Sequence, residues 1–144
     1  MTKISWTDEV WNPVTGCSRV SPGCEHCYAE RNALRWHPES KPWTAQNAGE
    51  NVVLHEDRID KPLHWRKPRR VFVNSVSDLF HELVPDEFIA EVFATMAVCE
   101  QHTFQILTKR PLRMRDWIAA NETLVSDEML WGRAPLRSEV QIAA

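Results

Sequence analysis

The sequence lacks an excess of positive charge and any apolar stretch long enough to span a membrane. The formal net charge of -3 comes from 20 acidic against 17 basic side chains, so no overall basic field drives unspecific nucleic-acid binding. The first residues contain no apolar signal-peptide core, and the most apolar segment, Phe88 to Val98, is interrupted by Glu91 and is far too short to cross a bilayer. These absences predict a cytoplasmic protein with no membrane segment.

Internal repeats, low-complexity tracts and long runs of charge are absent as well. With 144 residues and 43% hydrophobic content, the chain is long enough for one domain with a single core and too short for two ordinary ones. The seven tryptophans are spread along the sequence rather than patterned. We therefore interpret most of them as core and loop anchors, not as a platform on which bases stack.

Short apolar runs alternate with helical patterns along the chain. The expected strands are 9–12, 70–75 and 103–107, the expected helices are 25–36, one opening at 85–87 and 112–121, and residues 37–54 are expected to be irregular. Strand, helix, strand, helix is typical of right-handed parallel βα units, whose ligands bind at the carboxyl ends of the strands. The sequence therefore predicts an α/β fold with a site at these ends.

Cysteine is scarce, and three of the four cysteines lie close together. Cys17, Cys24 and Cys27 form the pattern Cys-x6-Cys-x2-Cys around the turn at Pro22-Gly23, whereas Cys99 stands alone. Because thiols stay reduced in the cytoplasm, we do not interpret the four as two disulfides. Cys99 is expected to be a small buried hydrophobe.

Soft thiolates brought to one point by such a loop favour a metal site, and three readings remain open. Structural zinc takes four protein ligands, and the fourth could be His26 or His37. A cubane iron–sulfur cluster held by three cysteines would leave one iron open to a small molecule. The third reading is a set of unligated core thiols.

Four separate blocks of the sequence, in this order, carry a resemblance to a known family. They are WNPVTGC at 11–17, PGCEHCYAE at 22–30, VFVNSVSDLF at 71–80 and ILTKRP at 106–111. Over roughly residues 4–118 the chain resembles a phage and bacterial family of three-Cys-motif, radical-SAM-like proteins of unsettled function. The usual radical SAM spacing is Cys-x3-Cys-x2-Cys, so the first gap is longer here, and His26 replaces the usual aromatic residue before the third cysteine.

The resemblance implies a 4Fe-4S cluster on Cys17, Cys24 and Cys27, with S-adenosylmethionine on the open iron. Electron transfer into its sulfonium would break a carbon–sulfur bond and release a deoxyadenosyl radical. The implied cofactor-binding residues are Tyr28, Asn74, Ser75, Ser77, Asp78, Thr108, Lys109 and Arg110. Hydroxyls and a carboxylate suit an ammonium or a ribose, whereas Lys109 or Arg110 suits a carboxylate or a phosphate.

The length of the chain limits how much of such a fold is expected. A complete parallel βα barrel takes about 250 residues, and the resemblance fades after Trp117. We therefore expect a partial parallel βα barrel of radical SAM type, apparently truncated, over residues 1–121, followed by a divergent, loosely packed tail over 122–144. The open barrel edge would allow self-association or a partner protein.

Two functional hypotheses follow from these patterns. The first is a radical-SAM-like redox enzyme, or an inactive remnant of one, with an unknown substrate. The second is a zinc-bound binding module that uses the basic patch at residues 66–70 on nucleic acid.

Overall fold

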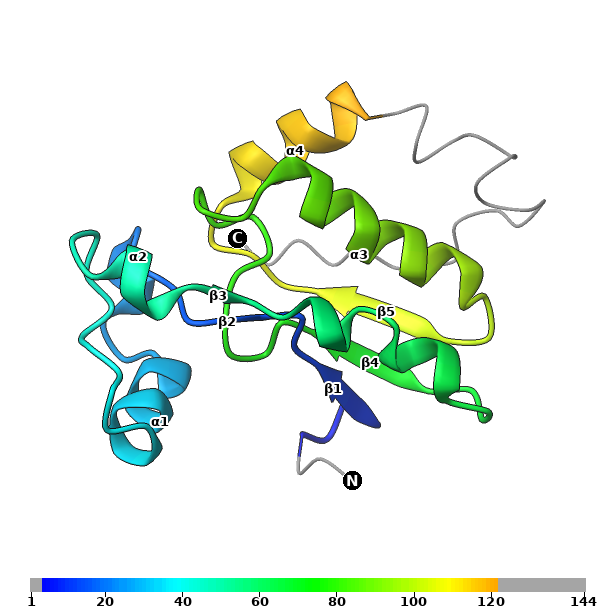
Figure 1. The fold of residues 1–144 in the computed structure, drawn as a ribbon, viewed down its shortest axis with the longest axis horizontal. Coiled ribbons are helices and arrows are strands. Elements are labelled where there is room, and N and C mark those ends of the chain that lie inside the picture. Colours follow the sequence, from blue (N-terminus) through cyan, green and yellow to red (C-terminus); the bar gives the residue numbers. More distant parts are fainter. Residues whose placement is uncertain (1–3, 122–144) are drawn as a thin grey trace.

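A three-stranded parallel sheet forms the centre of the molecule (Figure 1). In the computed structural model, which describes residues 4–121, its strands are β1 (Glu9–Trp11), β4 (Arg70–Val73) and β5 (Thr103–Ile106), in the order β1-β4-β5. The register places Val10 opposite Phe72, and Phe72 opposite Gln105. All three strands therefore end at the same edge of the sheet.

Two helices cover one face of this sheet (Figure 1). They are α3 (Asp86–Val98), which connects β4 to β5, and α4 (Pro111–Ala120), which follows β5. Because side chains alternate along a strand, Val71 and Val73 point into the core between sheet and helices, and Phe72 points to the other face. The core is Trp11, Val14, Val71, Val73, Leu79, Phe80, Val84, Phe88, Ile89, Val92, Phe93, Cys99, Phe104, Ile106, Met114 and Trp117.

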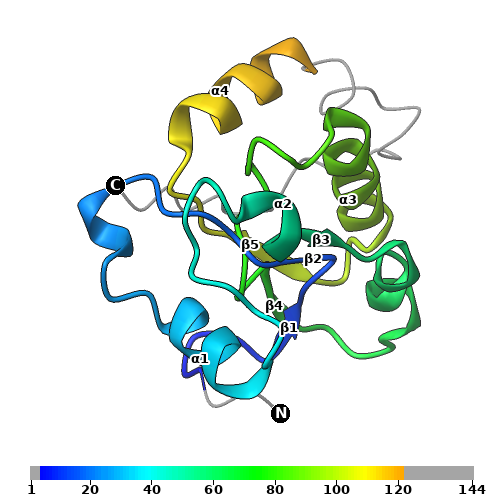
Figure 2. The ribbon, with the colours of Figure 1, turned by 60° about the vertical axis from the view of Figure 1, so that its left-hand side comes forward.

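The segment between β1 and β4 first extends beyond the carboxyl ends of the strands, over residues 14–54, and then returns, so that residues 61–64 lie beside the start of β5 (Figures 1 and 2). It contains β2 (Val14–Thr15), α1 (Tyr28–Trp36), α2 (Ala48–Asn51) and β3 (Val53–Leu54), together with 3₁₀ turns at Pro22–Cys24, Glu56–Arg58 and Lys61–His64. β2 and β3 pair antiparallel. The expectation that 37–54 is irregular is wrong in part, because α2 and β3 lie within it.

Gly16 is where the chain passes from β2 into the cysteine segment. Its φ is +78°, and a Cβ at this position would lie 1.8 Å from the carbonyl oxygen of Asn51. A side chain is therefore excluded both by the left-handed backbone and by the close approach of the two chain segments.

The expected α/β fold class and the expected strands and helices are confirmed in outline. The strands and helices lie where the pattern predicted them, within a few residues; the helix expected from residue 25 begins at Tyr28, with Cys27 as its N-cap. Residues 4–121 form a mixed α/β fold with a parallel sheet but no closed barrel. None of their helices is long and apolar enough to cross a membrane. The tail expected over 122–144 lies outside the described residues.

Candidate functional site

The carboxyl ends of β4 and β5 and the cysteine loop, residues 17–27, enclose one cavity of about 390 Å³. All three cysteines of the motif and all eight implied cofactor-binding residues line this cavity: Cys17, Cys24, Cys27, Tyr28, Asn74, Ser75, Ser77, Asp78, Thr108, Lys109 and Arg110. The volume falls in the range of pockets that bind small molecules. The fold thus brings together, at one place, segments from the beginning, middle and end of the described chain.

Three different local structures hold the three thiols at the cavity. Cys17 follows Gly16, Cys24 ends the 3₁₀ turn Pro22–Cys24, and Cys27 caps α1. All three are free and half-buried, whereas Cys99 is free and buried in the core, as expected.

Glu30 ties the cysteine loop to the chain that follows α1. Its carboxylate accepts two hydrogen bonds of 2.9 Å from Arg19 and one of 2.9 Å from the backbone N–H of Trp43. Burial alone would raise the pKa of Glu30, but these donors outweigh burial and lower it. The loop is therefore held near its start by a charged contact with three hydrogen bonds to Glu30.

The thiols of Cys17 and Cys24 differ in acidity. Burial raises the pKa of Cys17 to about 11, although the charge of Arg110 opposes this. Burial also raises the pKa of Cys24, but this effect is outweighed. Hydrogen bonds with the backbone of Val20 and Ser21 and, to a smaller extent, the charge of Lys109 lower the pKa overall. Cys24 thus ionises more readily than Cys17.

Asp78 joins the chain after β4 to the chain after β5. Its Oδ1 accepts hydrogen bonds from Thr108 Oγ1 at 2.7 Å and from the backbone N–H of Phe80 at 3.0 Å. Its Oδ2 accepts one from the backbone N–H of Lys109 at 2.9 Å and contacts Arg110 Nη1 at 3.4 Å. Both oxygens are engaged and the residue is 4% exposed, so Asp78 supports the cavity wall rather than offering a free carboxylate to a ligand.

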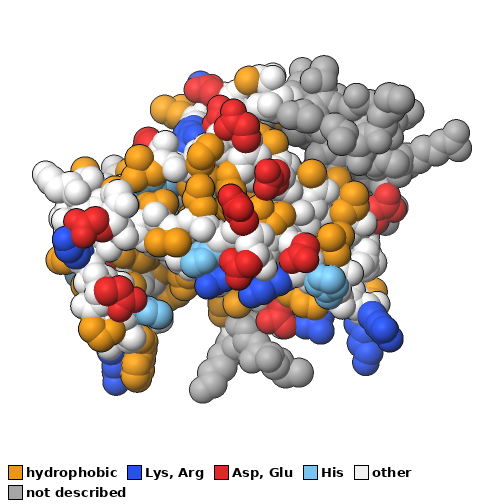
Figure 3. Space-filling model, viewed as in Figure 1, with side chains coloured by type: hydrophobic (Ala, Val, Ile, Leu, Met, Phe, Trp, Pro, Cys, Tyr) orange, Lys and Arg blue, Asp and Glu red, His pale blue; other side chains and the backbone are white. Residues whose placement is uncertain are grey.

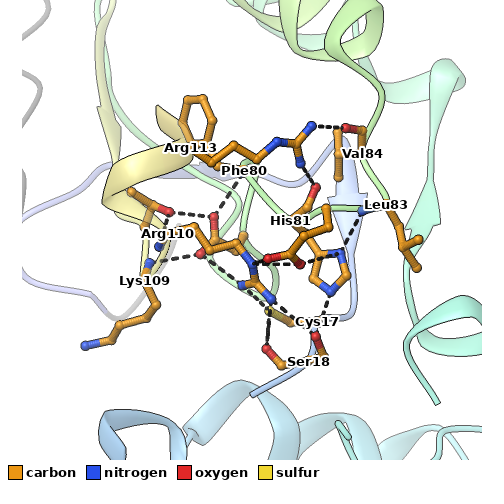
Figure 4. Close-up of polar contacts among 12 residues, drawn as sticks. Cys17, Ser18, Phe80, His81, Leu83, Val84, Lys109, Arg110 and Arg113 are labelled. Atoms are coloured by element: carbon orange, nitrogen blue, oxygen red, sulfur yellow. Dashed lines mark hydrogen bonds and ion pairs between the residues drawn. The ribbon is translucent and has the colours of Figure 1, made fainter. Parts of the chain in front are cut away.

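Arg110 is the centre of the buried polar network (Figure 4). Its Nε donates to the Glu82 carboxylate at 2.9 and 3.1 Å, and its Nη2 donates to Ser18 O and Oγ at 3.1 and 3.2 Å. Its Nη1 lies 3.5 Å from Cys17 Sγ, across 93 positions in sequence. Lys109 is exposed, and its Nζ makes no hydrogen bond or ion pair with residues 4–121. Of the two adjacent cations, only Lys109 is free for a ligand.

His81 and Ser18 complete the network and were not singled out from the sequence. His81 Nδ1 accepts from the backbone N–H of Leu83 at 3.1 Å, so the ring proton lies on Nε2, which is 2.8 Å from Ser18 Oγ. Burial, and secondly the charge of Arg110, lowers the pKa of His81. A titratable residue three positions after Asp78, in the loop that follows β4, is the signal that could have identified it.

Asn74 has an unusual backbone and an unused donor. Its φ is +57°, which is uncommon for a residue other than glycine. Its Oδ1 accepts from the backbone N–H of Val14 at 3.2 Å, while its buried Nδ2 has no hydrogen-bond partner among the described residues. Asn74 lines the cavity, but its unsatisfied Nδ2 is buried beneath the cavity surface.

The hydroxyl groups near the strand ends have partners within the protein. Ser75 Oγ donates to Asn12 Oδ1 at 3.2 Å, and Ser77 Oγ donates to Val14 O at 2.8 Å. Tyr28 OH donates to Ser75 O, which connects α1 to the end of β4. Each hydroxyl oxygen can still accept a hydrogen bond from a ligand.

Comparison with known proteins places the chain in a family. A family model described as "Protein of unknown function (DUF5131)" matches residues 1–141. The chain belongs to the DUF5131 family. No curated protein and no solved structure gave a match. The description of DUF5131 assigns no activity, so the chemistry of this site rests on its own residues.

The two histidines considered as a fourth metal ligand lie apart in this DUF5131 protein. His26 lines the cavity with the cysteines, whereas His37 lies at the end of α1, lines a different cavity and pairs with Glu39 at 3.4 Å. Within residues 4–121, no three side chains of His, Cys, Asp or Glu are grouped so that they could hold one metal ion. The cysteine loop would have to close further around a single zinc ion.

The basic patch of this DUF5131 protein is partly neutralised. Arg69 pairs with Glu9 at 2.7 Å and Arg70 with Asp8 at 3.0 Å, which leaves Arg66 and Lys67 exposed. On the face shown in Figure 3, acidic and basic side chains are interspersed. The charge that the patch offers to a polyanion is smaller than the sequence suggests.

Proposed function

We propose that this protein is a radical-SAM-like iron–sulfur protein with the framework of a partial parallel βα barrel. In this proposal Cys17, Cys24 and Cys27 hold a 4Fe-4S cluster and the adjoining cavity takes S-adenosylmethionine. The observation that carries the proposal is that the three thiols line one cavity with the carboxyl ends of β4 and β5. In α/β folds, ligands bind at this edge of the sheet.

Three thiolates that line one cavity are the ligand number of a cubane cluster with one open iron. A tetrahedral zinc site needs each sulfur about 2.3 Å from one point, and the three thiols are not gathered in that way. A cubane binds each thiolate to a separate iron, so it accepts a wider spacing, and three ligands leave one iron open. When bound and reduced by a one-electron protein donor, such a cluster supplies the electron that cleaves the sulfonium into methionine and a deoxyadenosyl radical.

The residues of this chain divide into those that contact the cofactor and those that support the wall. Lys109, an exposed cation beside the cysteine loop, would bind the carboxylate of S-adenosylmethionine. Tyr28 and Ser75 offer acceptor oxygens, and Asn74 would support the wall beneath them, since its Nδ2 is buried and has no partner among the described residues. Asp78, Thr108 and Arg110 would hold these groups in place, because their polar atoms already bond to one another.

Iron and sulfide analysis of the full chain, purified and reconstituted without oxygen, tests the proposal. We expect a brown protein, and we expect C17A, C24A and C27A each to lose most of the bound iron. C99A is the matched control, since Cys99 is buried in the core and lies outside the cavity, and it should keep its iron. Equal iron in C24A and the parent would contradict the proposal.

A zinc-bound binding module is the second candidate, and one observation favours it: His26 lines the same cavity as the three cysteines. It predicts a colourless protein with one zinc per chain that H26A loses. The same metal analysis therefore decides between the two candidates.

A further inference from the structure

The contact between Arg110 and Cys17 is the only charged hydrogen bond to a cavity thiol that residues 4–121 provide. A guanidinium has five N–H donors on three nitrogens. In Arg110, Nε faces Glu82, Nη2 faces Ser18, and Nη1 faces Cys17 Sγ and Asp78. No donor is left over for a substrate or a cofactor carboxylate.

The position of Arg110 is fixed by the network rather than by the thiol. The residue is 6% exposed, and its backbone N–H donates to Thr108 Oγ1 at 2.9 Å, which in turn donates to Asp78. Figure 4 shows the guanidinium between the end of β5 and the start of the cysteine loop, close to Cys17 and Ser18. A full positive charge is therefore held next to one sulfur before any metal binds.

We propose that Arg110 is a positioning residue that raises the reduction potential of the cluster through the sulfur of Cys17; this inference rests on the proposed function. Reduction adds one electron to the cluster, and that charge spreads onto the thiolate sulfurs. A cation and an N–H donor at the sulfur stabilise the reduced form more than the oxidised form. Hydrogen bonds to the sulfurs and burial are among the factors that set iron–sulfur potentials.

Glu82 pairs with Arg110, and its removal should have the opposite effect on the reduction potential. It is the exposed partner of the buried Arg110, with side chains 62% and 5% exposed, and it accepts from Nε, whereas Cys17 Sγ lies against Nη1. Its negative charge offsets part of the field of Arg110 at the sulfur. Removing the carboxylate should therefore move the potential in the direction opposite to removing the guanidinium.

The experiment is an EPR-monitored redox titration of the reconstituted full chain and of R110Q, R110K and E82Q. In R110Q we expect about a tenfold smaller ratio of reduced to oxidised cluster at a fixed solution potential, which is ~59 mV for one electron. R110K keeps the charge and should lie nearer the parent. E82Q should shift the potential upward. Iron per chain and circular dichroism show whether each variant is loaded and folded.

The possible results distinguish a failure of the role of Arg110 from a failure of the proposed function. Loss of folding would shift the reduction potentials of R110Q and E82Q in the same direction or remove iron from both variants. Opposite shifts of the two potentials therefore exclude loss of folding as the cause. If the parent holds the cluster but R110Q and E82Q have the same reduction potential as the parent, the role of Arg110 is overturned and the proposed function stands. A parent that binds no iron overturns the proposed function and this inference together. If R110Q does not fold, an unchanged potential in E82Q still overturns the inference.

Discussion

The two walls of the cavity are built in different ways. The strand-end wall contains Asp78, Thr108 and Arg110, which are buried and bond to one another. The opposite wall is the cysteine loop, where residues 19–23 are exposed and the thiols are half-buried. Glu30 and Arg110 fasten this loop at two points.

The strand-end wall is therefore preorganised, whereas the cysteine loop can change its conformation. A wall whose polar groups are already satisfied keeps its shape without a ligand and loses little entropy when one binds. A loop with few contacts can close around a metal, so its order depends on metal binding. Substitutions in each wall test this contrast, and the largest effect is expected in the strand-end wall.

Breaking the strand-end wall should destabilise the protein strongly. In D78A the donors of Thr108, Phe80 and Lys109 lose their acceptor and Arg110 loses a buried partner. Removing one partner of a buried pair costs about 3–5 kcal/mol. Urea denaturation of D78A and the parent measures this loss in the free energy of unfolding.

The matched control for D78A is S21A in the cysteine loop. Ser21 is exposed, and its hydroxyl makes only a weak contact with Cys24 at 3.8 Å. We expect a change within about 0.5 kcal/mol. Equal losses in D78A and S21A would show that the two walls are not different.

Acid should weaken the strand-end wall through His81. Its pKa in the folded protein is lowered from the ordinary value of 6.5, chiefly by burial and then by the positive charge of Arg110. The negative charges of Glu82 and Asp78 oppose this lowering, and the charge of Arg113 adds to it. Below about pH 6.5 the unfolded chain therefore binds more protons than the folded one, and the free energy of unfolding falls as pH decreases. Above that pH His81 is neutral in both states and contributes no slope.

Urea unfolding of the parent and H81Q at several values between pH 5 and 8 measures this effect. The loss of stability on the acid side of pH 6.5 should be smaller in H81Q, although H81Q is less stable at pH 8 because it disturbs the contacts with Ser18 and Leu83. Parallel pH curves for the two proteins would exclude His81 as the titrating group.

The smallest effect on stability should come from Lys109, although it lines the same cavity. Its Nζ has no partner within the described chain, so K109A should change the free energy of unfolding by less than about 0.5 kcal/mol. If Lys109 binds the carboxylate of S-adenosylmethionine, its loss should raise Kd about tenfold, or ~1.4 kcal/mol. Equilibrium dialysis with the reconstituted protein measures Kd, and K109R is the conservative control. An unchanged Kd in K109A would place the carboxylate elsewhere.

The sequence predicted the parallel unit well because its signals are local. Val71 and Val73 lie in an apolar run of strand length, and the residues of α3 repeat with helical spacing. The strands β2 and β3 were missed because each has two residues, too few for any periodicity. Their pairing depends on contacts between distant segments.

The candidate site was predicted as a set of residues but not as a network. Parallel strands end at one edge, so Ser75 and Lys109 were expected near the cysteine loop. Nothing local to Asp78 shows that both its oxygens are used, since Thr108 and Lys109 lie about 30 positions later. The contact between Arg110 and Cys17 spans 93 positions and follows only from the folded chain. Which polar side chains are free for a ligand, and which are already hydrogen-bonded within the protein, could therefore be decided only from the three-dimensional structure.

The close crossing at Gly16 fixes where the cysteine loop begins. Cys17 leaves from that point and Cys27 sits at the start of α1, while the residues between Arg19 and Gly23 face solvent. Insertions there would project outward without moving either end, and each doubling of a flexible loop's length costs only about 0.6 kcal/mol. The spacing between the first two cysteines is therefore free to drift during evolution, and a search that demands one fixed gap would overlook sites built on this plan.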